Sequence, residues 1–122
     1  MKLAARLKDQ KLLKTLCYID GQWVGEGAPQ IEVTDPATDE VIATVPSLGT
    51  AETRAAIEAA AKAQKAWAKR PAKERAAILR RWFDLMMANQ DDLGAILTAE
   101  QGKPLAEAKG EIAYAASFIE FY

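Results

Sequence analysis

The spacing of apolar residues divides the chain into a strand-forming part and a helical part. In the first part, runs of apolar residues alternate with polar ones at a period of two, which is typical of half-buried strands. From Thr50 onward the period changes to 3.6, which predicts helices up to the last residue. The pattern therefore predicts a short helix and two β-hairpins in residues 1–48, followed by four helices in residues 50–122.

Turn-forming residues locate the two hairpins. The segment LCYIDGQWV predicts two strands joined at Asp20-Gly21, a dipeptide that tolerates the positive φ angles of a type I′ turn. In IEVTDPATDEVIATVP, Ile31 and Val33 alternate with polar neighbours and DPATDE supplies the bend of a second hairpin. Cys17 lies in the first strand, where we expect a core thiol because no base or cationic cluster is near it in sequence.

Each of the first three helices has a boundary signal and an apolar stripe. We expect Thr50 to cap the first helix, the second to open near Pro71, and the third to run from about Asn89 to a C-cap at Gly102, after which Pro104 restarts the chain. The residues expected to face a core in the first helix are Ile57, Ala60, Ala61 and Trp67. Those expected in the second are Ile78, Leu79, Trp82, Phe83 and Met86.

The last helix is predicted to be apolar on two nearly opposite faces. One stripe consists of Leu105, Ala108, Ile112, Ala115, Ile119 and Tyr122, and the other of Gly110, Tyr114, Phe118 and Phe121. A helix with two apolar faces has to lie between two layers, and no stop signal precedes the last residue. We therefore expect this chain to be the beginning of a larger protein, cut in the middle of a helix.

Glu100 is placed in line with the apolar residues Leu93, Ile96 and Leu97 of the third helix. Two interpretations stay open. Either the helix frays after Thr98 and the carboxylate meets water, or the carboxylate is paired, hydrogen-bonded, protonated or bound to a cation, since an unpaired buried charge is costly. A cation would also need backbone carbonyl ligands, because no second carboxylate stands at helical spacing.

Composition excludes several classes of function. The chain has 16 basic and 17 acidic residues and a net charge of -1, so we expect neither a nucleic-acid nor a membrane partner. The absence of histidine removes Ser-His and Cys-His pairs. The lone Cys17 permits no internal disulfide and favours the cytoplasm. Asp9 and the dense lysines make the opening MKLAARLKDQKLLKTL a solvated surface helix rather than a transit peptide.

Four stretches resemble a known enzyme family. They are YIDGQWV, VTDPATDEVIATVP, KERAAILRRWFDLMM and EQGKPLAEAKGEIAYAASFIEFY, and they are similar to the opening of bacterial aldehyde dehydrogenases of the succinate-semialdehyde dehydrogenase branch. Glutarate-semialdehyde dehydrogenases share the last stretch. The resemblance implies an α/β, aldehyde dehydrogenase-like fold, of which residues 1–122 form the N-terminal portion of the NAD(P)-binding domain.

The same resemblance implies an NAD- or NADP-dependent oxidation of a small semialdehyde to a dicarboxylic acid through a cysteine thioester, in a homodimer or homotetramer. The catalytic and nucleotide-binding residues of the family lie in later segments, so we expect none in this chain, and Cys17 does not match the nucleophile. An alternative is a free-standing helical module that docks a partner through Tyr114, Phe118 and Phe121.

In the family, the last helix of this segment borders the tunnel through which the aldehyde enters. The resemblance therefore makes Gly110, Tyr114 and Phe118 candidates for the tunnel wall, with plain core packing as the alternative. Lys103, in the Gly-Lys-Pro elbow, is interpreted as a solvated turn residue rather than a catalytic one.

Glu100 matches an acidic position that holds a structural cation in several relatives, together with two backbone carbonyls. In this chain those carbonyls belong to Val33 and Thr34. The resemblance thus implies a monovalent or divalent cation held by Val33, Thr34 and Glu100.

Overall fold

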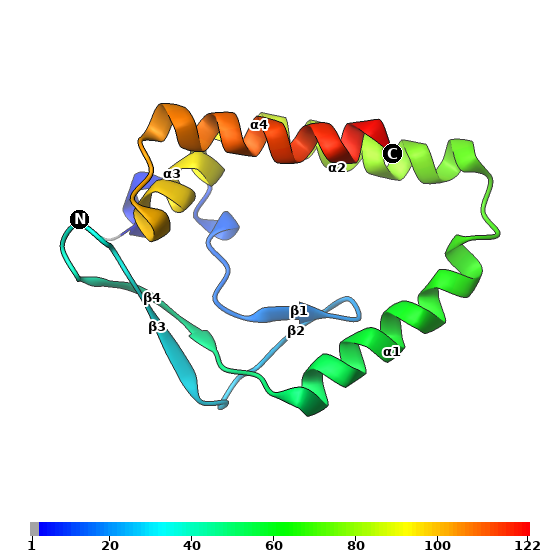
Figure 1. Cartoon of the computed structure of the whole chain (residues 1–122), viewed down its shortest axis with the longest axis horizontal. Helices are drawn as coiled ribbons and strands as arrows, with labels where there is room; N and C mark the ends of the chain where they lie inside the picture. Colours follow the sequence, from blue (N-terminus) through cyan, green and yellow to red (C-terminus); the bar gives the residue numbers. More distant parts are fainter. Residues whose placement is uncertain (1–2) are drawn as a thin grey trace.

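The computed structural model describes residues 3–122 and contains the predicted two hairpins and four helices (Figure 1). The N-terminal stretch differs from the expected solvated helix, whose first two residues lie outside the described part of the chain. It forms two short 3-10 turns, η1 (Leu3–Arg6) and η2 (Gln10–Leu12). Leu3 and Leu7 are only 4% and 6% exposed, so apolar contact with the helices holds this stretch.

The first hairpin is as predicted. Strands β1 (Cys17–Ile19) and β2 (Gln22–Val24) pair antiparallel. Asp20 and Gly21 both have positive φ, at 50° and 79°, as a type I′ turn requires. The thiol of Cys17 is free and half-buried.

The second hairpin pairs β3 (Gln30–Thr34) with β4 (Val41–Pro46). The register is regular up to Val33 and shifts between Val33 and Thr34. Such a shift marks a β-bulge, which disrupts the ladder of backbone hydrogen bonds and bends the strand. The two carbonyls expected to hold a cation therefore lie at an irregular point of the sheet.

Helix α1 (Thr50–Trp67) begins one residue earlier than expected, with Gly49 as N-cap. Thr50 is wrong as the cap because the Glu52 carboxylate already accepts a hydrogen bond from the Gly49 N–H at 2.9 Å. No residue of α1 is buried, and Ile57 is 65% exposed.

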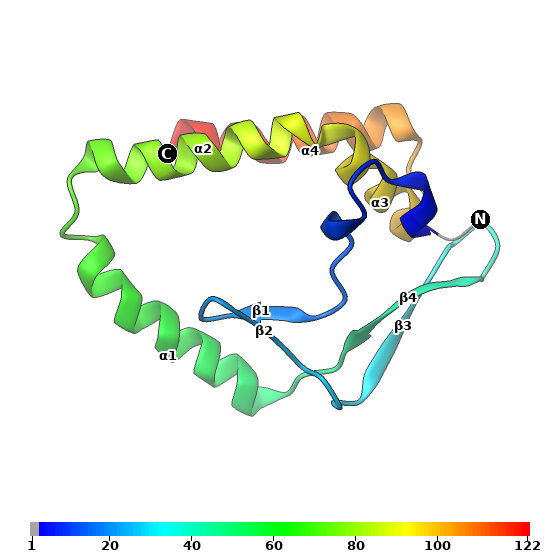
Figure 2. The ribbon, with the colours of Figure 1, turned by 180° about the vertical axis from the view of Figure 1, so that it is seen from behind.

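The expected core stripe of α1 is therefore wrong in this chain. Ala60 and Ala61 are exposed, and Trp67 is half-buried. The reason is visible in Figures 1 and 2: α1 runs apart from the other helices and is joined to them through residues 68–71. No second layer covers its apolar side in the part of the chain that the structure describes.

Helices α2 (Ala72–Ala88) and α4 (Leu105–Phe121) lie side by side in opposite directions (Figures 1 and 2). Ala108 and Ala116 of α4 are completely buried, and such small side chains let neighbouring helix axes approach closely. The expected core stripe of α2 is only partly confirmed. Its half-buried residues are Leu79, Phe83 and Met86, whereas Ile78 and Trp82 are exposed.

Helix α3 (Gln90–Gln101) packs against the start of α4. The contact is tight at Gly94, where an added Cβ would lie 3.0 Å from Cγ and 3.4 Å from N of Lys109. Gly102 caps α3 in the left-handed conformation, with φ of 77°, as predicted. The helix continues past Thr98, so the fraying that one of the two interpretations of Glu100 assumed does not occur, although Glu100 is exposed to water as that interpretation expected.

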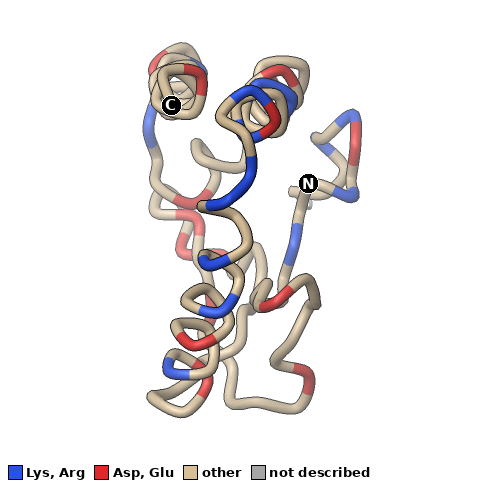
Figure 3. The backbone as a smooth tube through the Cα atoms, turned by 90° about the vertical axis from the view of Figure 1, so that its right-hand side faces the viewer, with Lys and Arg blue, Asp and Glu red and all other residues tan. Residues whose placement is uncertain are grey.

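Charge is distributed unevenly along this chain of nearly zero net charge. Lys and Arg residues are frequent where α1 is joined to α2, as the colours of the backbone tube in Figure 3 show. The basic residues of this region are Lys62, Lys65, Lys69, Arg70, Lys73, Arg75, Arg80 and Arg81. The expectation of no nucleic-acid partner rested on the total charge and stays a prediction. Within residues 3–122, no helix has the length and apolar character needed to cross a membrane.

Candidate functional site

The three candidate tunnel residues lie together on one exposed face of α4. Gly110, Tyr114 and Phe118 follow at helical spacing, and Tyr114 and Phe118 are 64% and 51% exposed. Their rings meet edge to face, with centroids 4.9 Å apart. An added Cβ at Gly110 would meet no heavy atom within 4 Å, so the glycine leaves open space beside the ring pair. Their role as a tunnel wall stays a prediction.

The exposed aromatic face continues to the end of α4. An open hollow of about 450 Å³ lies there, lined by Ser117, Phe118, Phe121 and Tyr122. On the opposite face, Ala108, Ile112 and Ile119 are buried or half-buried. Of the two predicted apolar stripes, one therefore packs only in part within this chain, since Leu105, Ala115 and Tyr122 are exposed, and the other is exposed throughout.

The candidate cation residues come from two elements. Glu100 is exposed near the end of α3, and its side chain makes no hydrogen bond or ion pair with the other described residues. An added Cβ at Gly102 would lie 2.9 Å from Cγ of Pro36, so the end of α3 touches the bend that follows β3. This contact brings the helix of Glu100 near the strand that contains Val33 and Thr34.

A cation at this position would depend on backbone oxygens. Within residues 3–122, no group of three or more His, Cys, Asp or Glu side chains is placed to hold a metal ion. Backbone carbonyls are ordinary ligands of hard cations, so the donor set of one carboxylate and two carbonyls suits such an ion. The cation site stays a prediction.

A polar cluster that the sequence did not indicate lies at the start of α3. The side chain of Asp92 is only 6% exposed and accepts backbone N–H groups from Lys8 at 3.0 Å and from Asp9 at 2.8 Å. Acidic residues in the first turn of a helix are ordinarily explained by the helix dipole. Their partners here lie 83 and 84 residues away in sequence, so no local signal could have identified them.

Asp91 links the same cluster to α4. Its carboxylate pairs with Nζ of Lys109 at 2.7 Å and with Nζ of Lys8 at 2.9 Å. The hydrogen bond from Lys109, followed by that from Lys8, lowers the pKa of Asp91 to about 2. Backbone N–H groups of Asp9 and Lys8 lower the pKa of Asp92, and the hydrogen bond to Asp91 raises the pKa of Lys8. Both carboxylates are thus held ionised near neutral pH, which suits an anchor rather than a proton-transfer catalyst.

Lys103 is not the solvated turn residue that was expected. Its side chain is 23% exposed and pairs with the carboxylate of Glu111 in the second turn of α4. The pair joins the elbow after α3 to the following helix. Lys103 therefore has a structural partner in this chain.

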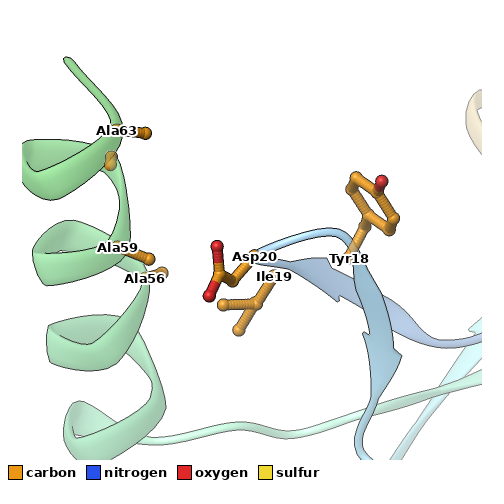
Figure 4. A pocket seen from close by; sticks show the side chains of 7 residues that line it. Tyr18, Ile19, Asp20, Ala56, Ala59 and Ala63 are labelled. Atoms are coloured by element: carbon orange, nitrogen blue, oxygen red, sulfur yellow. The ribbon is translucent and has the colours of Figure 1, made fainter. Parts of the chain in front are cut away.

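A second hollow, of about 240 Å³, lies between the tip of the first hairpin and α1 (Figure 4). Ile19 and Asp20 point toward Ala56 and Ala59, whereas the ring of Tyr18 lies farther from α1. Asp20 is the one charged side chain among the residues that line this hollow. The lining is otherwise mainly apolar and offers no acid–base pair.

Nucleotide phosphates commonly bind where a strand leads into the N-terminus of a helix. Among residues 3–122, the connection from β4 to α1 has this form. Its Gly49 N–H is already occupied by the Glu52 carboxylate, whose negative charge opposes a phosphate. This connection does not fit the phosphates of NAD or NADP.

Comparison with known proteins gives matches to one enzyme family. Residues 23–122 match the aldehyde dehydrogenase family. The chain is 63% identical over 118 residues to the glutarate-semialdehyde dehydrogenase of Pseudomonas putida, covering 96% of this chain and 25% of that protein. It is 53% identical over 118 residues to the NADP(+) succinate-semialdehyde dehydrogenase GabD of Escherichia coli, covering 96% and 24%.

The solved structures include close matches of the same family. The crystal structure of an aldehyde dehydrogenase from Brucella melitensis biovar abortus is similar with a TM-score of 0.89 and 58% identity, over 93% of this chain and 24% of that one. The chain thus spans about a quarter of the length of the curated relatives it matches.

Proposed function

Because this chain belongs to the aldehyde dehydrogenase family, we propose that it forms the N-terminal part of an NAD(P)-dependent semialdehyde dehydrogenase. The observation that best supports this proposal is the high sequence identity, over nearly the whole chain, to two enzymes named for the semialdehydes of glutarate and succinate. The proposed reaction oxidises succinate semialdehyde or glutarate semialdehyde to the dicarboxylic acid. When bound, NAD or NADP supplies the hydride acceptor for this oxidation.

The residues of this chain would bind and guide the substrate rather than react with it. The exposed face of α4 offers Tyr114 and Phe118 as a paired aromatic surface and Gly110 as a gap beside it. An apolar wall suits the methylene chain of a semialdehyde, while the charged end of the substrate needs a cationic partner elsewhere in the protein. The same face would equally serve the alternative predicted above, a free-standing helical interaction module.

Three further features belong to the proposal. The enzyme is proposed to act in the cytoplasm, in keeping with the free thiol of Cys17. It is proposed to assemble as a homodimer or homotetramer. A structural monovalent or divalent cation is proposed to be held by Glu100 and the carbonyls of Val33 and Thr34, a choice supported by the contact between Gly102 and Pro36.

The test is an assay of the complete protein with both nucleotides and matched aldehydes. Succinate semialdehyde is compared with butanal, and glutarate semialdehyde with pentanal, while nucleotide reduction is followed spectrophotometrically. We expect a higher kcat/KM for a semialdehyde than for the uncharged aldehyde of the same length, because only the semialdehyde has a distal carboxylate to bind. Equal values, or no nucleotide reduction with any pair, would contradict the proposed function and leave the interaction module as the better explanation.

A further inference from the structure

The polar cluster at the start of α3 joins three parts of the chain that are distant in sequence. We propose that it acts as a clasp that fixes the rotation of α4 and so the direction in which the exposed face of α4 points. The clasp consists of Lys8, Asp9, Asp91, Asp92 and Lys109. Asp92 and Lys109 are then positioning residues for the aldehyde path, an assignment that rests on the proposed function of Gly110, Tyr114 and Phe118.

The first half of the clasp holds the N-terminal segment on α3. The two oxygens of Asp92 each accept one backbone N–H, from Lys8 at 3.0 Å and from Asp9 at 2.8 Å. Hydrogen bonds to an ionised carboxylate are stronger than neutral ones, and a nearly buried carboxylate cannot exchange them for water. Leu3 and Leu7, both buried, add apolar contacts within the same segment.

The second half links α3 to Lys109 of α4. The ammonium of Lys109 lies 2.7 Å from the Asp91 carboxylate, and its backbone carbonyl accepts a hydrogen bond from Nε2 of Gln90 at 2.8 Å. The backbone of Lys109 also packs against Gly94, where no larger residue fits without displacing it. Lys109 is therefore held by its side chain, its carbonyl and its backbone together.

The position of Lys109 determines where the candidate wall points. Gly110 follows it directly, and each helical residue is turned by about 100° from the one before it. A small rotation of α4 at Lys109 would therefore turn Gly110, Tyr114 and Phe118 together. At the other end, α4 is tied to α2 by Arg80 and Glu120 at 2.9 Å. The ion pair at that end is exposed and contributes little on its own, as does an exposed ion pair within the clasp. Lys109 is held in addition by the hydrogen bond to its carbonyl and by the packing of its backbone against Gly94, so we infer that the clasp is the stronger constraint.

Asp91 makes the N-terminal segment part of this constraint. Its carboxylate binds both Lys8 and Lys109, so the same group touches the first residues of the chain and α4. Through the clasp, the N-terminal segment helps to set the direction in which Gly110, Tyr114 and Phe118 point.

The kinetic test uses the complete enzyme with Asp92→Ala, with Asp92→Asn as the conservative variant, and with Glu58→Gln, at an exposed position on α1, as an acidic control outside the clasp. Asp92→Ala removes both charge-assisted hydrogen bonds to the N-terminal segment, and we expect part of that loss to appear as a rise of about tenfold in KM for the semialdehyde. KM for the nucleotide and kcat should change less than twofold, and Asp92→Asn should restore part of the loss. An equal rise in both KM values, or lowered stability with both KM values unchanged, would overturn the proposal.

A second measurement does not depend on catalysis. Amide hydrogen exchange in Asp92→Ala should be faster at Lys8 and Asp9 and also at residues 108–113 of α4, while α2 keeps its protection. Unchanged exchange in α4 would contradict the clasp whatever the protein catalyses. Faster exchange in α4 of a protein that oxidises no aldehyde would support the clasp and reject the proposed function. If Asp92→Ala does not fold, Asp92→Asn and Lys109→Met serve for both measurements.

Discussion

The Asp92 carboxylate accepts a hydrogen bond from the backbone N–H of Asp9 at 2.8 Å, although 83 residues separate the two in sequence. The neighbouring N–H of Lys8 binds the other oxygen. These two bonds attach the start of the described chain to the helical layer. The N-terminal segment that precedes the first hairpin is therefore connected to the helices by a polar contact.

Acid should release the N-terminal segment from α3. The pKa of Asp91 is lowered to about 2 and that of Asp92 is also lowered, so both carboxylates stabilise the folded state above their ordinary pKa of 3.8 and lose this effect as the pH falls through the folded value. The raised pKa of Lys8 acts at the other extreme: its contribution is present below 10.5 and is lost above its folded pKa. Hydrogen exchange at Lys8 and Asp9, corrected for the intrinsic rate, should accelerate as the pH falls below 3.8 through the lowered pKa of Asp92.

The matched controls for the acid effect are Asp91→Asn and Asp92→Asn. Each removes a titrating group while keeping its shape, so the pH dependence of exchange at Lys8 and Asp9 should become shallower. If the unaltered protein showed the same flat profile as these variants, the two carboxylates would not hold the segment.

Replacing two glycines of the helical layer by larger residues should change the free energy of unfolding in opposite directions. Gly94→Val should lower the free energy of unfolding by about 1–3 kcal/mol, because its side chain enters space filled by Lys109. Gly110→Ala should raise it by about 1 kcal/mol, because alanine is the better helix former and an added Cβ at Gly110 meets nothing within 4 Å. Denaturant unfolding of the complete protein measures both. A neutral Gly94→Val would mean that α3 and α4 are less tightly packed than described.

Truncating the exposed rings of α4 should affect substrate binding more than stability. Tyr114→Ala and Phe118→Ala should each raise KM for the semialdehyde if the rings line its path. The free energy of unfolding should change by less than about 1 kcal/mol, because both side chains are exposed. Leu79→Ala, on the half-buried side of α2, should lower the free energy of unfolding and leave KM for the semialdehyde unchanged. Lowered stability with unchanged KM in the ring variants would favour core packing for this face.

Glu100→Gln tests the proposed cation. The variant keeps the shape of the side chain and removes its charge, so it should lower the melting temperature in sodium-containing buffer and should have little effect in sodium-free buffer containing a bulky organic cation. Glu58→Gln, an exposed position on α1, is the control and should show no dependence on sodium. Equal melting of Glu100→Gln and the unaltered protein in both buffers would rule out the cation.

A charge reversal at the start of α2 should stabilise the protein. Lys73 lies in the first turn of α2 among the basic residues that join α1 to α2. Lys73→Glu places a negative charge at a helix N-terminus and relieves repulsion, so we expect a gain of about 0.5–1 kcal/mol at low salt that diminishes as salt is added. Lys65→Glu places a negative charge in the last turn of α1, where the helix dipole disfavours it, so it should not increase the stability.

Local signals predicted the elements of this fold well. Asp20-Gly21 and Gly102 were recognised because the positive φ at each position is a property of the residue and its neighbours. The N-cap of α1 was misplaced by one residue, since Thr50 is a good cap by type and only the bond from the Gly49 N–H to Glu52 decides otherwise. Boundaries of this kind depend on a single hydrogen bond.

Contacts between distant segments were the part that the sequence could not supply. Leu3 and Leu7 lie in a stretch with the composition of a solvated helix, yet both are buried, and the segment packs against α3, which is distant in sequence. The same holds for Asp92, whose partners are backbone groups without any sequence signature. The pattern of α4 indicated two apolar faces, but only the structure shows which of them, the side of Ala108 and Ala116, packs within this chain.

Helix α1 buries none of its residues against the rest of the chain. Its persistence as a helix therefore depends on its alanine-rich composition and on the cap at Gly49, and an isolated helix of this length is only marginally stable in water. In this chain, α1 should be the first element to open in local fluctuations, and residues 68–71 should be the first cut by a protease. The region around α3, which the clasp holds, should open only at a higher free energy. The free energy of local opening should therefore differ from one end of the molecule to the other.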